Sequence, residues 1–459
     1  MSKIALMIDF GSTYSKFTAV DLDSVKIVGR VTLPTDSQKN LINCYSQGKE
    51  KILQQIETDQ PIEEYFCSSA WGGFRMVAIG LTATLTAQAA QRAALGAGTR
   101  ILKTYYYRLK DAQVEEIRDA DPDVILLTGG TDGGNHDITC DNASVLNRIL
   151  DHGVILYAGN QDAVSEIKQI FTNPKIKVYY TENVMPSVNV LNPVPVRTIA
   201  QEIFMKKIIQ TEGISDVAQH STLPIIPTPT AVLKAAHLLA EGTESEKGIG
   251  PLMIVDIGGA TTDIHSVGNG LPKTDDTFFE GLAEPYLKRT VEGDLGMRSS
   301  ARSLVKSKGL AEFQTQLGPD WTIEDIESAC STRTGQADYI APTDREKYFD
   351  NNLALVAADF AMERHAGRLR KQHSDNRMVY YQTGKDLRQF HTVIGTGGVI
   401  VHNDDPVKIL KASFQVEEDI LKPTDPKCLV DKQYLISTLG ILSQKYPEAA
   451  LKLLKEALI

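Results

Sequence analysis

Three carboxylates stand beside glycine-rich turns in two distant segments of this chain. Asp9 precedes the turn Gly11-Ser12-Thr13, and Asp256 and Asp263 enclose a run that contains Gly258 and Gly259. Turns of glycine and small hydroxyl residues expose backbone N–H groups that can bind phosphate oxygens, and glycine lets the backbone approach a bulky anion. An aspartate at a strand end is suited to hold Mg²⁺, which keeps much of its water shell. We therefore expect two phosphate-binding hairpins with a magnesium ion.

Each turn also has a plainer interpretation, as an ordinary hairpin with an aspartate in its turn. This interpretation fits the first segment as well as the phosphate site does. It fits the second segment poorly, because the like charges of Asp256 and Asp263 repel one another unless a cation lies nearby.

The two segments share one layout. The run LMIVDIGGATTDIHSVG from Leu252 repeats IALMIDFGSTYSKFTAV from Ile4, with an apolar strand, an aspartate, a glycine-containing turn and a second strand in the same order. Such an internal duplication predicts two lobes with the same core, whose equivalent turns face one another across a cleft.

The rest of the chain alternates between strand and helix patterns, which predicts an α/β fold. We expect a three-stranded meander over 4–32, a loop over 331–350, a helix over 353–371 and two helices in the tail 434–458. The buried strand Val124–Leu127 runs into the glycines of 129–134, and we expect it to hold the equivalent place in the first lobe. The predicted domains are a first lobe (1–190), a mainly helical connecting region (191–245), a second lobe (246–405) and a C-terminal helical tail (406–459).

Composition excludes several classes of protein. The 459 residues are 42% hydrophobic and carry a net charge of −10, which suits a globular protein and disfavours nucleic acid as a partner. Five cysteines without a CxxC pair argue against a disulfide framework and a structural zinc site. Neither a signal peptide nor an apolar run of membrane-spanning length is evident, so we expect no membrane partner and a cytoplasmic location.

The two turns resemble the phosphate signatures of the actin, sugar kinase and heat-shock chaperone ATPase superfamily, and the second matches the chaperone form Asp-x-Gly-Gly-x-Thr-x-Asp in full. The superfamily's adenosine signature, a strand running into a double glycine, is matched by the segment 393–400, although alone this is also a plain strand-to-helix turn. The resemblance implies two duplicated actin-like (ribonuclease H-like) lobes with an ATP cleft between them. The implied nucleotide contacts are Gly11, Ser12, Thr13, Lys16, Gly258, Gly259, Thr261, Thr262, Gly395, Gly397 and Gly398.

The whole chain resembles the accessory proteins of methylaspartate (glutamate) mutase, which are similar to the large subunits of diol dehydratase reactivases. The runs MIDFGSTYSKFTAVD, DPDVILLTGGTDGGN, YAGNQDA, VDIGGATTDIHSV and RTVEGDLGMR carry the resemblance. It implies an ATP- and Mg²⁺-dependent reactivating factor, chaperone-like, that partners the subunits of an adenosylcobalamin-dependent mutase and releases damaged cobalamin. Asp9, Asp256 and Asp263 would then be the catalytic and metal-binding residues that organise magnesium and the attacking water. The family shares its name with a DNA mismatch-repair protein, a role that the acidic charge and the hairpins do not favour.

Two features leave alternatives open. The chain has no clear equivalent of the catalytic lysine of the chaperones' first lobe, and Lys16 is the cation nearest the first turn. The run Arg289–Gly296 is a secondary candidate for the lining of the cleft. The rival functions are a small-molecule kinase, an ATP-dependent hydrolase related to hydantoinases, and a nucleotide-binding scaffold without turnover.

Overall fold

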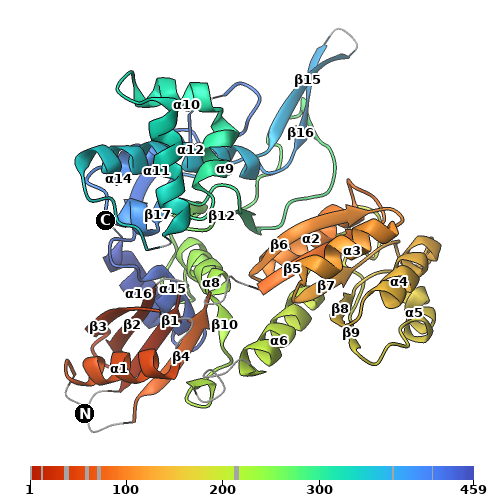
Figure 1. Ribbon diagram of the computed structural model, residues 1–459, viewed down its shortest axis with the longest axis horizontal. Coiled ribbons are helices and arrows are strands. Elements are labelled where there is room, and N and C mark those ends of the chain that lie inside the picture. Colours follow the sequence, from red (N-terminus) through yellow and green to blue (C-terminus); the bar gives the residue numbers. More distant parts are fainter. Residues whose placement is uncertain are drawn as a thin grey trace. The chain divides into compact units, whose positions relative to one another are not determined.

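The computed structural model describes residues 3–11, 14–35, 41–56, 61–69, 74–210, 217–336, 338–374, 377–415 and 417–458 (Figure 1). The chain forms two compact units. Unit 1 comprises Met1–Ala231 and Gly281–Pro285, and unit 2 comprises Val232–Glu280 and Tyr286–Ile459. Each unit is described separately below.

Unit 1 contains a five-stranded mixed sheet with the strand order β10-β4-β1-β2-β3. Strands β1, β2 and β3 form the predicted antiparallel meander, and β1, β4 and β10 run parallel. Every residue of the apolar β1 is buried, as expected for a strand covered on both faces. The strands are β1 (Ile4–Phe10), β2 (Tyr14–Asp21), β3 (Lys26–Pro34), β4 (Glu63–Ser68) and β10 (Ile226–Pro227).

Unit 2 contains a second five-stranded sheet with the same topology, in the order β14-β12-β11-β17-β18. Strands β11, β12 and β14 form an antiparallel meander, as β1, β2 and β3 do in unit 1. Strands β11, β17 and β18 run parallel, as β1, β4 and β10 do. This agreement confirms the duplication and the α/β fold of both lobes. The strands are β11 (Leu252–Ile257), β12 (Thr262–Val267), β14 (Leu287–Glu292), β17 (Thr392–Thr396) and β18 (Lys427–Val430).

Unit 1 also contains a second sheet, which is entirely parallel and has the order β6-β5-β7-β8-β9. The strand Val124–Leu127 belongs to this sheet, so our placement of it in the first lobe's sheet was wrong; β4 holds the place equivalent to β17. The elements are β5 (Phe74–Gly80), α2 (Thr86–Gly96), β6 (Thr99–Tyr106), α3 (Asp111–Ala120), β7 (Val124–Leu127), α4 (Asp137–Ile149), β8 (Gly153–Tyr157), η2 (Gln161–Ala163), α5 (Val164–Ile170) and β9 (Ile176–Tyr180).

Among the described residues, three further helices precede the second sheet in the chain: α1 (Leu41–Leu53), α6 (Val194–Gln210) and α8 (Thr228–Glu241). Helix α1 packs on β2 and β3. A Cβ at Gly48 would lie 2.2 Å from the ring of Phe17, so only glycine allows this approach. Helices α6 and α8 account for the predicted helical character of 191–245. The predicted domain boundaries themselves stay predictions.

The described part of unit 2 also contains a three-stranded sheet, most of α8 and the eight helices α9 to α16. Helix α12 packs against β11, β12 and β14. The predicted loop 331–350 was wrong, because α11 ends at Gly335 and α12 begins at Asp344; the predicted helix 353–371 ends at His365 and is followed by a strand. The two tail helices are confirmed. The elements are β13 (Thr277–Phe279), α9 (Ala301–Lys308), α10 (Leu310–Leu317), α11 (Ile323–Gly335), α12 (Asp344–His365), β15 (Arg368–Ser374), β16 (Arg377–Thr383), α13 (Gly398–Val401), α14 (Pro406–Ala412), α15 (Ile436–Leu442) and α16 (Pro447–Ala457).

Candidate functional site

The first hairpin joins β1 to β2 in unit 1. Asp9 is 1% exposed and pairs across the strands with Lys16, whose Nζ lies 3.7 Å from Asp9 Oδ2. At Gly11 the N–H donates to the Asp9 carbonyl oxygen, and a Cβ would lie 2.4 Å from the Tyr14 carbonyl oxygen, so the turn requires glycine. The predicted phosphate contacts Ser12 and Thr13 lie outside the described residues.

Two residues that the sequence analysis missed hold the Asp9 carboxylate. The Thr228 hydroxyl donates to Asp9 Oδ1 over 2.7 Å, and the Cys67 thiol donates to the same oxygen over 3.3 Å. Burial and the nearby Asp9 charge raise the pKa of the Cys67 thiol well above its ordinary value, so the thiol stays protonated and remains a donor. The sequence signal for Thr228 was the run Ile-Pro-Thr-Pro-Thr, which lies within the region 191–245 that we expected to be mainly helical.

The second hairpin joins β11 to β12 in unit 2, and Asp256 pairs directly across the strands with Asp263. Residues opposite one another on an antiparallel pair point to the same face of the sheet. The predicted pair of carboxylates therefore exists, next to the turn of this hairpin. Asp256 is partly exposed, whereas Asp263 is 7% exposed.

At the tip of the second hairpin, the carbonyl oxygens are hydrogen-bonded to the following segment, whereas two backbone N–H groups are exposed. The Gly258 N–H donates to the Thr261 carbonyl oxygen, and the Gly258 and Gly259 carbonyl oxygens accept from the N–H groups of residues 297–299. Gly259 and Ala260 are exposed, and none of the described residues accepts a hydrogen bond from their N–H groups. The tip thus offers backbone donors to an anion.

Thr262 and Thr261 differ in what they can reach. The Thr262 hydroxyl is fully buried and donates to the Leu295 carbonyl oxygen over 2.8 Å, which ties the strand to the following loop. Thr261, at the turn, is partly exposed. Of the two predicted threonine contacts, Thr261 is the one that lies at the surface of the hairpin.

Arg289 on β14 holds Asp263. Its Nη2 lies 2.7 Å from Asp263 Oδ2, and both side chains are buried. The other oxygen, Asp263 Oδ1, is buried and accepts no hydrogen bond from any described residue. His265, buried beside this pair, stays neutral because burial and the Arg289 charge lower its pKa to about 3. From the sequence alone, the run 289–296 is only a secondary candidate for the lining of the cleft.

The third glycine motif follows β17, which runs parallel to β11 with Thr396 beside Asp256. Gly397 has φ +94°, and a Cβ there would lie 2.3 Å from the Ile257 carbonyl oxygen. Gly398 is exposed, 3.6 Å from the Tyr434 hydroxyl by the same measure. Gly395 is buried, and a Cβ there would lie within 3 Å of core side chains.

Tyr434 is a further residue near this motif that the sequence analysis did not assign to the site. It precedes α15 in a turn with φ +52°, not in a helix as we had expected. Burial, Asp256 and Asp431 raise the pKa of its hydroxyl, so it remains a protonated phenol close to Asp256. The structure thus brings Asp256, Asp263, Gly258, Gly259, Thr261, Gly397 and Gly398 to one end of the second sheet, while Asp9, Gly11 and Lys16 lie at the equivalent end of the first.

Gly397 and Gly398 follow β17, and we expect alanine substitutions at these two positions to differ in their effect on stability. We expect Gly397→Ala to lower the free energy of unfolding by about 1–3 kcal/mol, because the new Cβ meets the Ile257 backbone and alanine is strained at this φ. Gly398→Ala is the matched control and should leave stability unchanged, since its Cβ has room. Denaturant unfolding of both variants tests this; equal stabilities would contradict the packing of Gly397 on β11.

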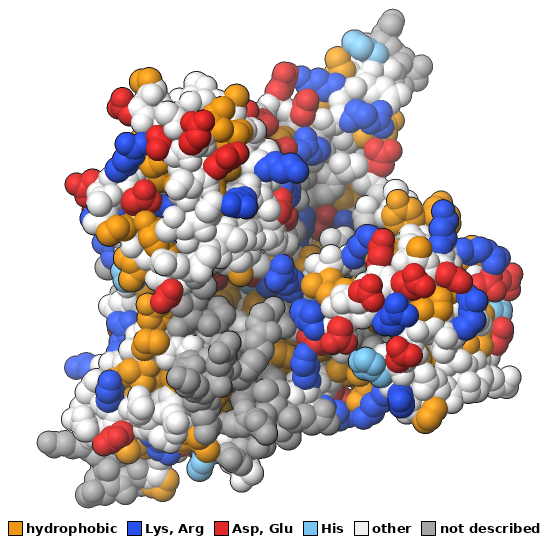
Figure 2. Space-filling model, in the orientation of Figure 1, with side chains coloured by type: hydrophobic (Ala, Val, Ile, Leu, Met, Phe, Trp, Pro, Cys, Tyr) orange, Lys and Arg blue, Asp and Glu red, His pale blue; other side chains and the backbone are white. Residues whose placement is uncertain are grey.

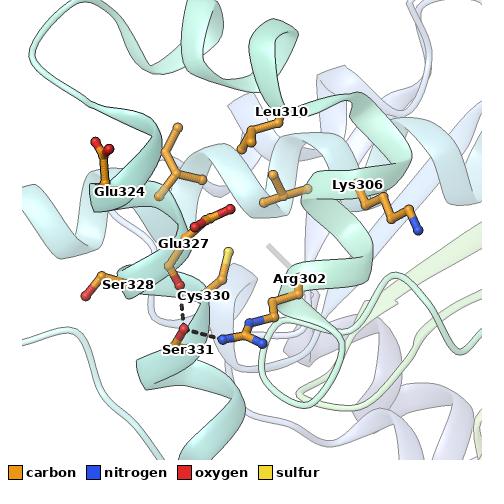
Figure 3. A pocket seen from close by; sticks show the side chains of 10 residues that line it. Arg302, Lys306, Leu310, Glu324, Glu327, Ser328, Cys330 and Ser331 are labelled. Carbon is orange, nitrogen blue, oxygen red and sulfur yellow. Dashed lines mark hydrogen bonds between the residues drawn. The ribbon is translucent and has the colours of Figure 1, made fainter.

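Other candidate sites in the described residues are few. A cavity of about 570 Å³ between α9, α10 and α11 contains none of the predicted site residues (Figure 3). In it Arg302 donates to Ser331, and burial raises the pKa of the Cys330 thiol to about 11, which leaves the thiol unreactive. No group of three or more His, Cys, Asp or Glu side chains suited to a metal occurs in the described ranges.

The charge of the surface and the hydropathy of the helices are relevant to nucleic acid and membranes as possible partners. Lys and Arg side chains are interspersed with acidic side chains on the visible face (Figure 2). No helix within the described part of the chain has both the length and the hydropathy that a membrane crossing requires.

Comparisons with known proteins find relatives along the whole chain. "Protein MutL" of Clostridium tetanomorphum is 44% identical over 461 residues, which is 99% of this chain and 99% of that protein. A nucleotide-free acetone carboxylase structure is 13% identical, with a TM-score of 0.45 over 96% of this chain and 70% of the other. The activator of 2-hydroxyisocaproyl-CoA dehydratase from Clostridium difficile, with bound ADPNP, is 10% identical, with a TM-score of 0.31 over 99% and 96%.

With TM-scores below 0.5, these two structures support no functional argument. A model of the MutL protein family, in contrast, matches residues 5–458. Together with the 44% identical relative, this match covers both hairpins and the third glycine motif. The chain therefore belongs to the MutL protein family.

Proposed function

We propose that this protein is an ATPase that reactivates an adenosylcobalamin-dependent mutase, with glutamate mutase as the expected partner. Adenosylcobalamin enzymes run radical chemistry and need rescue once the adenosyl group is lost and damaged cobalamin stays bound. The resemblance of the chain to mutase accessory proteins supports the choice of partner. The two actin-like lobes and their hairpins support the use of ATP.

The observation that carries the ATPase proposal is the shared register of the two hairpins. In each, an aspartate at the end of the first strand pairs with a residue at the start of the second: Asp9 with Lys16, and Asp256 with Asp263. One hairpin therefore presents an anion and a cation, and the other presents two anions. Magnesium-bound ATP needs both, because its phosphate oxygens are stabilised by cations while its metal is held by carboxylates. We assign to Lys16 the contact with phosphate oxygens.

Magnesium fits the donors of the second hairpin. Mg²⁺ binds through one or two carboxylates together with waters and phosphate oxygens. Asp263 Oδ1 is a buried acceptor without a described hydrogen-bond partner, and such an atom costs about 1–3 kcal/mol while it stays unsatisfied. Asp256, Asp263 and, from the first lobe, Asp9 would hold the ion, which when bound would neutralise phosphate charge.

The remaining site residues bind and orient the nucleotide in this proposal. The exposed N–H groups of Gly259 and Ala260 donate to phosphate oxygens, with Gly258 and Thr261 beside them, and the Gly11–Thr13 turn is the proposed phosphate contact of the first lobe. Gly397 and Gly398 let the backbone pack beside the adenosine, and Gly395 supports them from the core. Asp256 and Asp263 orient the attacking water. Thr262 fixes the strand that carries Asp263.

Reactivation would follow from a change between two arrangements of the lobes. In the first, the phosphate turns of both lobes would bind the nucleotide; after hydrolysis they would bind it less tightly and the lobes would rotate. Nucleotide-driven switches of this kind act through local electrostatic contacts with global consequences. In the mutase complex, the rotation would open the enzyme for release of damaged cobalamin.

Magnesium dependence of ATP binding tests this proposal. We expect calorimetric titration to show ATP binding about 5- to 150-fold weaker in EDTA than in Mg²⁺, the usual range for two coupled ligands. Asp256→Asn should lose this difference. Asp404→Asn, an exposed aspartate on the same unit, is the matched control and should keep it. Equal ATP affinities with and without magnesium in the parent protein would contradict the site.

A further inference from the structure

Asp9 is a buried carboxylate whose two oxygens have different surroundings. Oδ1 accepts hydrogen bonds from the Thr228 hydroxyl and the Cys67 thiol, at 2.7 Å and 3.3 Å. Oδ2 lies on the side of Lys16, whose side chain is 26% exposed. The side chain is thus fixed through Oδ1, and Oδ2 is the oxygen that lies on the side of Lys16.

We propose that Thr228 is the positioning residue for Asp9: its hydroxyl fixes the carboxylate in the orientation that magnesium-bound ATP requires. This inference rests on the proposed ATP site. Thr228 itself does not touch nucleotide or metal in this account; it acts through Asp9.

The strand register explains why these three residues meet. In the parallel strands β1, β4 and β10, Asp9 pairs with Cys67, and Cys67 pairs with Ile226. The carboxyl ends of parallel strands lie at one edge of a sheet, which is where ligands bind in α/β folds. Thr228 directly follows β10 and begins the 14-residue helix α8. The same edge therefore carries the carboxylate and its two donors in a row.

The hydroxyl of Thr228 is better suited to this role than the thiol of Cys67. A hydroxyl is a strong donor, whereas a thiol is a weak one, and the shorter contact is the one to Thr228. The first turn of α8 also places the positive end of a helix dipole toward the carboxylate, which favours its charged form. Partners that orient a metal-binding carboxylate typically change metal affinity or activity by about 10- to 100-fold when they are removed.

Three variants separate positioning from packing. Thr228→Val keeps the shape and removes the hydroxyl, and Thr228→Ser keeps the hydroxyl. Thr230→Val is the matched control: it removes a threonine two residues further along α8, whose hydroxyl donates to the Ala97 carbonyl oxygen and not to Asp9. Thr228→Ala is measured in parallel, so that a folding defect of the valine variant does not decide the result.

The measurement is ATP binding by calorimetry in Mg²⁺ and in EDTA. We expect Thr228→Val and Thr228→Ala to weaken binding in Mg²⁺ by about tenfold or more and to leave binding in EDTA unchanged, while Thr228→Ser and Thr230→Val behave as the parent does. Parental magnesium dependence in both hydroxyl-free variants would overturn the role of Thr228 and leave the ATP site standing. Absence of magnesium dependence in the parent protein would instead contradict the proposed function.

Discussion

Asp256→Asn should hydrolyse ATP at least about 100-fold more slowly than the parent protein while it folds normally. Asp256 is partly exposed at the end of β11, so the nearly isosteric amide leaves the strand and its burial unchanged. It removes the negative charge that, in the proposed site, holds magnesium and orients the attacking water. Phosphate release at saturating Mg-ATP and a thermal unfolding curve measure the two properties. A folded Asp256→Asn protein with the parental rate would contradict the assignment.

Asp263, the other carboxylate of the second hairpin, requires a different mutational experiment, because it also forms an ion pair with Arg289. Both side chains are buried, so Asp263→Ala breaks a buried ion pair by removing one partner, which typically costs about 3–5 kcal/mol. A loss of activity in that variant alone would be ambiguous. The double variant Asp263→Asn, Arg289→Met removes both charges; we expect it to recover stability and to remain inactive. Recovery of hydrolysis in the double variant would show that Asp263 serves folding only.

The duplicated fold could be predicted because its signal is local. An apolar strand, an aspartate and a glycine turn recur as one run, and the two meanders follow from neighbouring residues. The parallel sheet over 74–180 could not be predicted in the same way. A short apolar strand that ends in glycines, such as Val124–Leu127, has the same pattern in any buried parallel sheet. Only long-range strand order decides to which sheet it belongs.

The site shows the same division between local and distant signals. Asp256 and Asp263 lie on one hairpin, so their spacing revealed them. Thr228 is 219 residues from Asp9 in the sequence and belongs to none of the motifs that we recognised. Arg289 stands on a third strand, and Tyr434 reaches Asp256 from the chain's last segment. Buried partners of this kind are set by tertiary packing, which a single sequence does not encode in its periodicity.

Rescue of an inactivated mutase is the second large effect that we expect. Glutamate mutase that has undergone suicide inactivation should regain activity only when this protein, Mg-ATP and fresh adenosylcobalamin are all present. A non-hydrolysable ATP analogue should support nucleotide binding, because the phosphate turns bind the nucleotide and not its cleavage. It should fail to sustain repeated rounds of rescue, since return of the lobes to their first arrangement depends on hydrolysis.

The rescue assay with the Asp256→Asn variant tests the central claim most directly. Mutase turnover is followed after inactivation, with the parent protein, the Asp256→Asn variant and the control Asp404→Asn each added with Mg-ATP and adenosylcobalamin. We expect recovery with the parent protein and with the control, and none with Asp256→Asn. Absence of recovery with the parent protein across related cobalamin mutases, accompanied by phosphate transfer from ATP to a small-molecule acceptor, would contradict it.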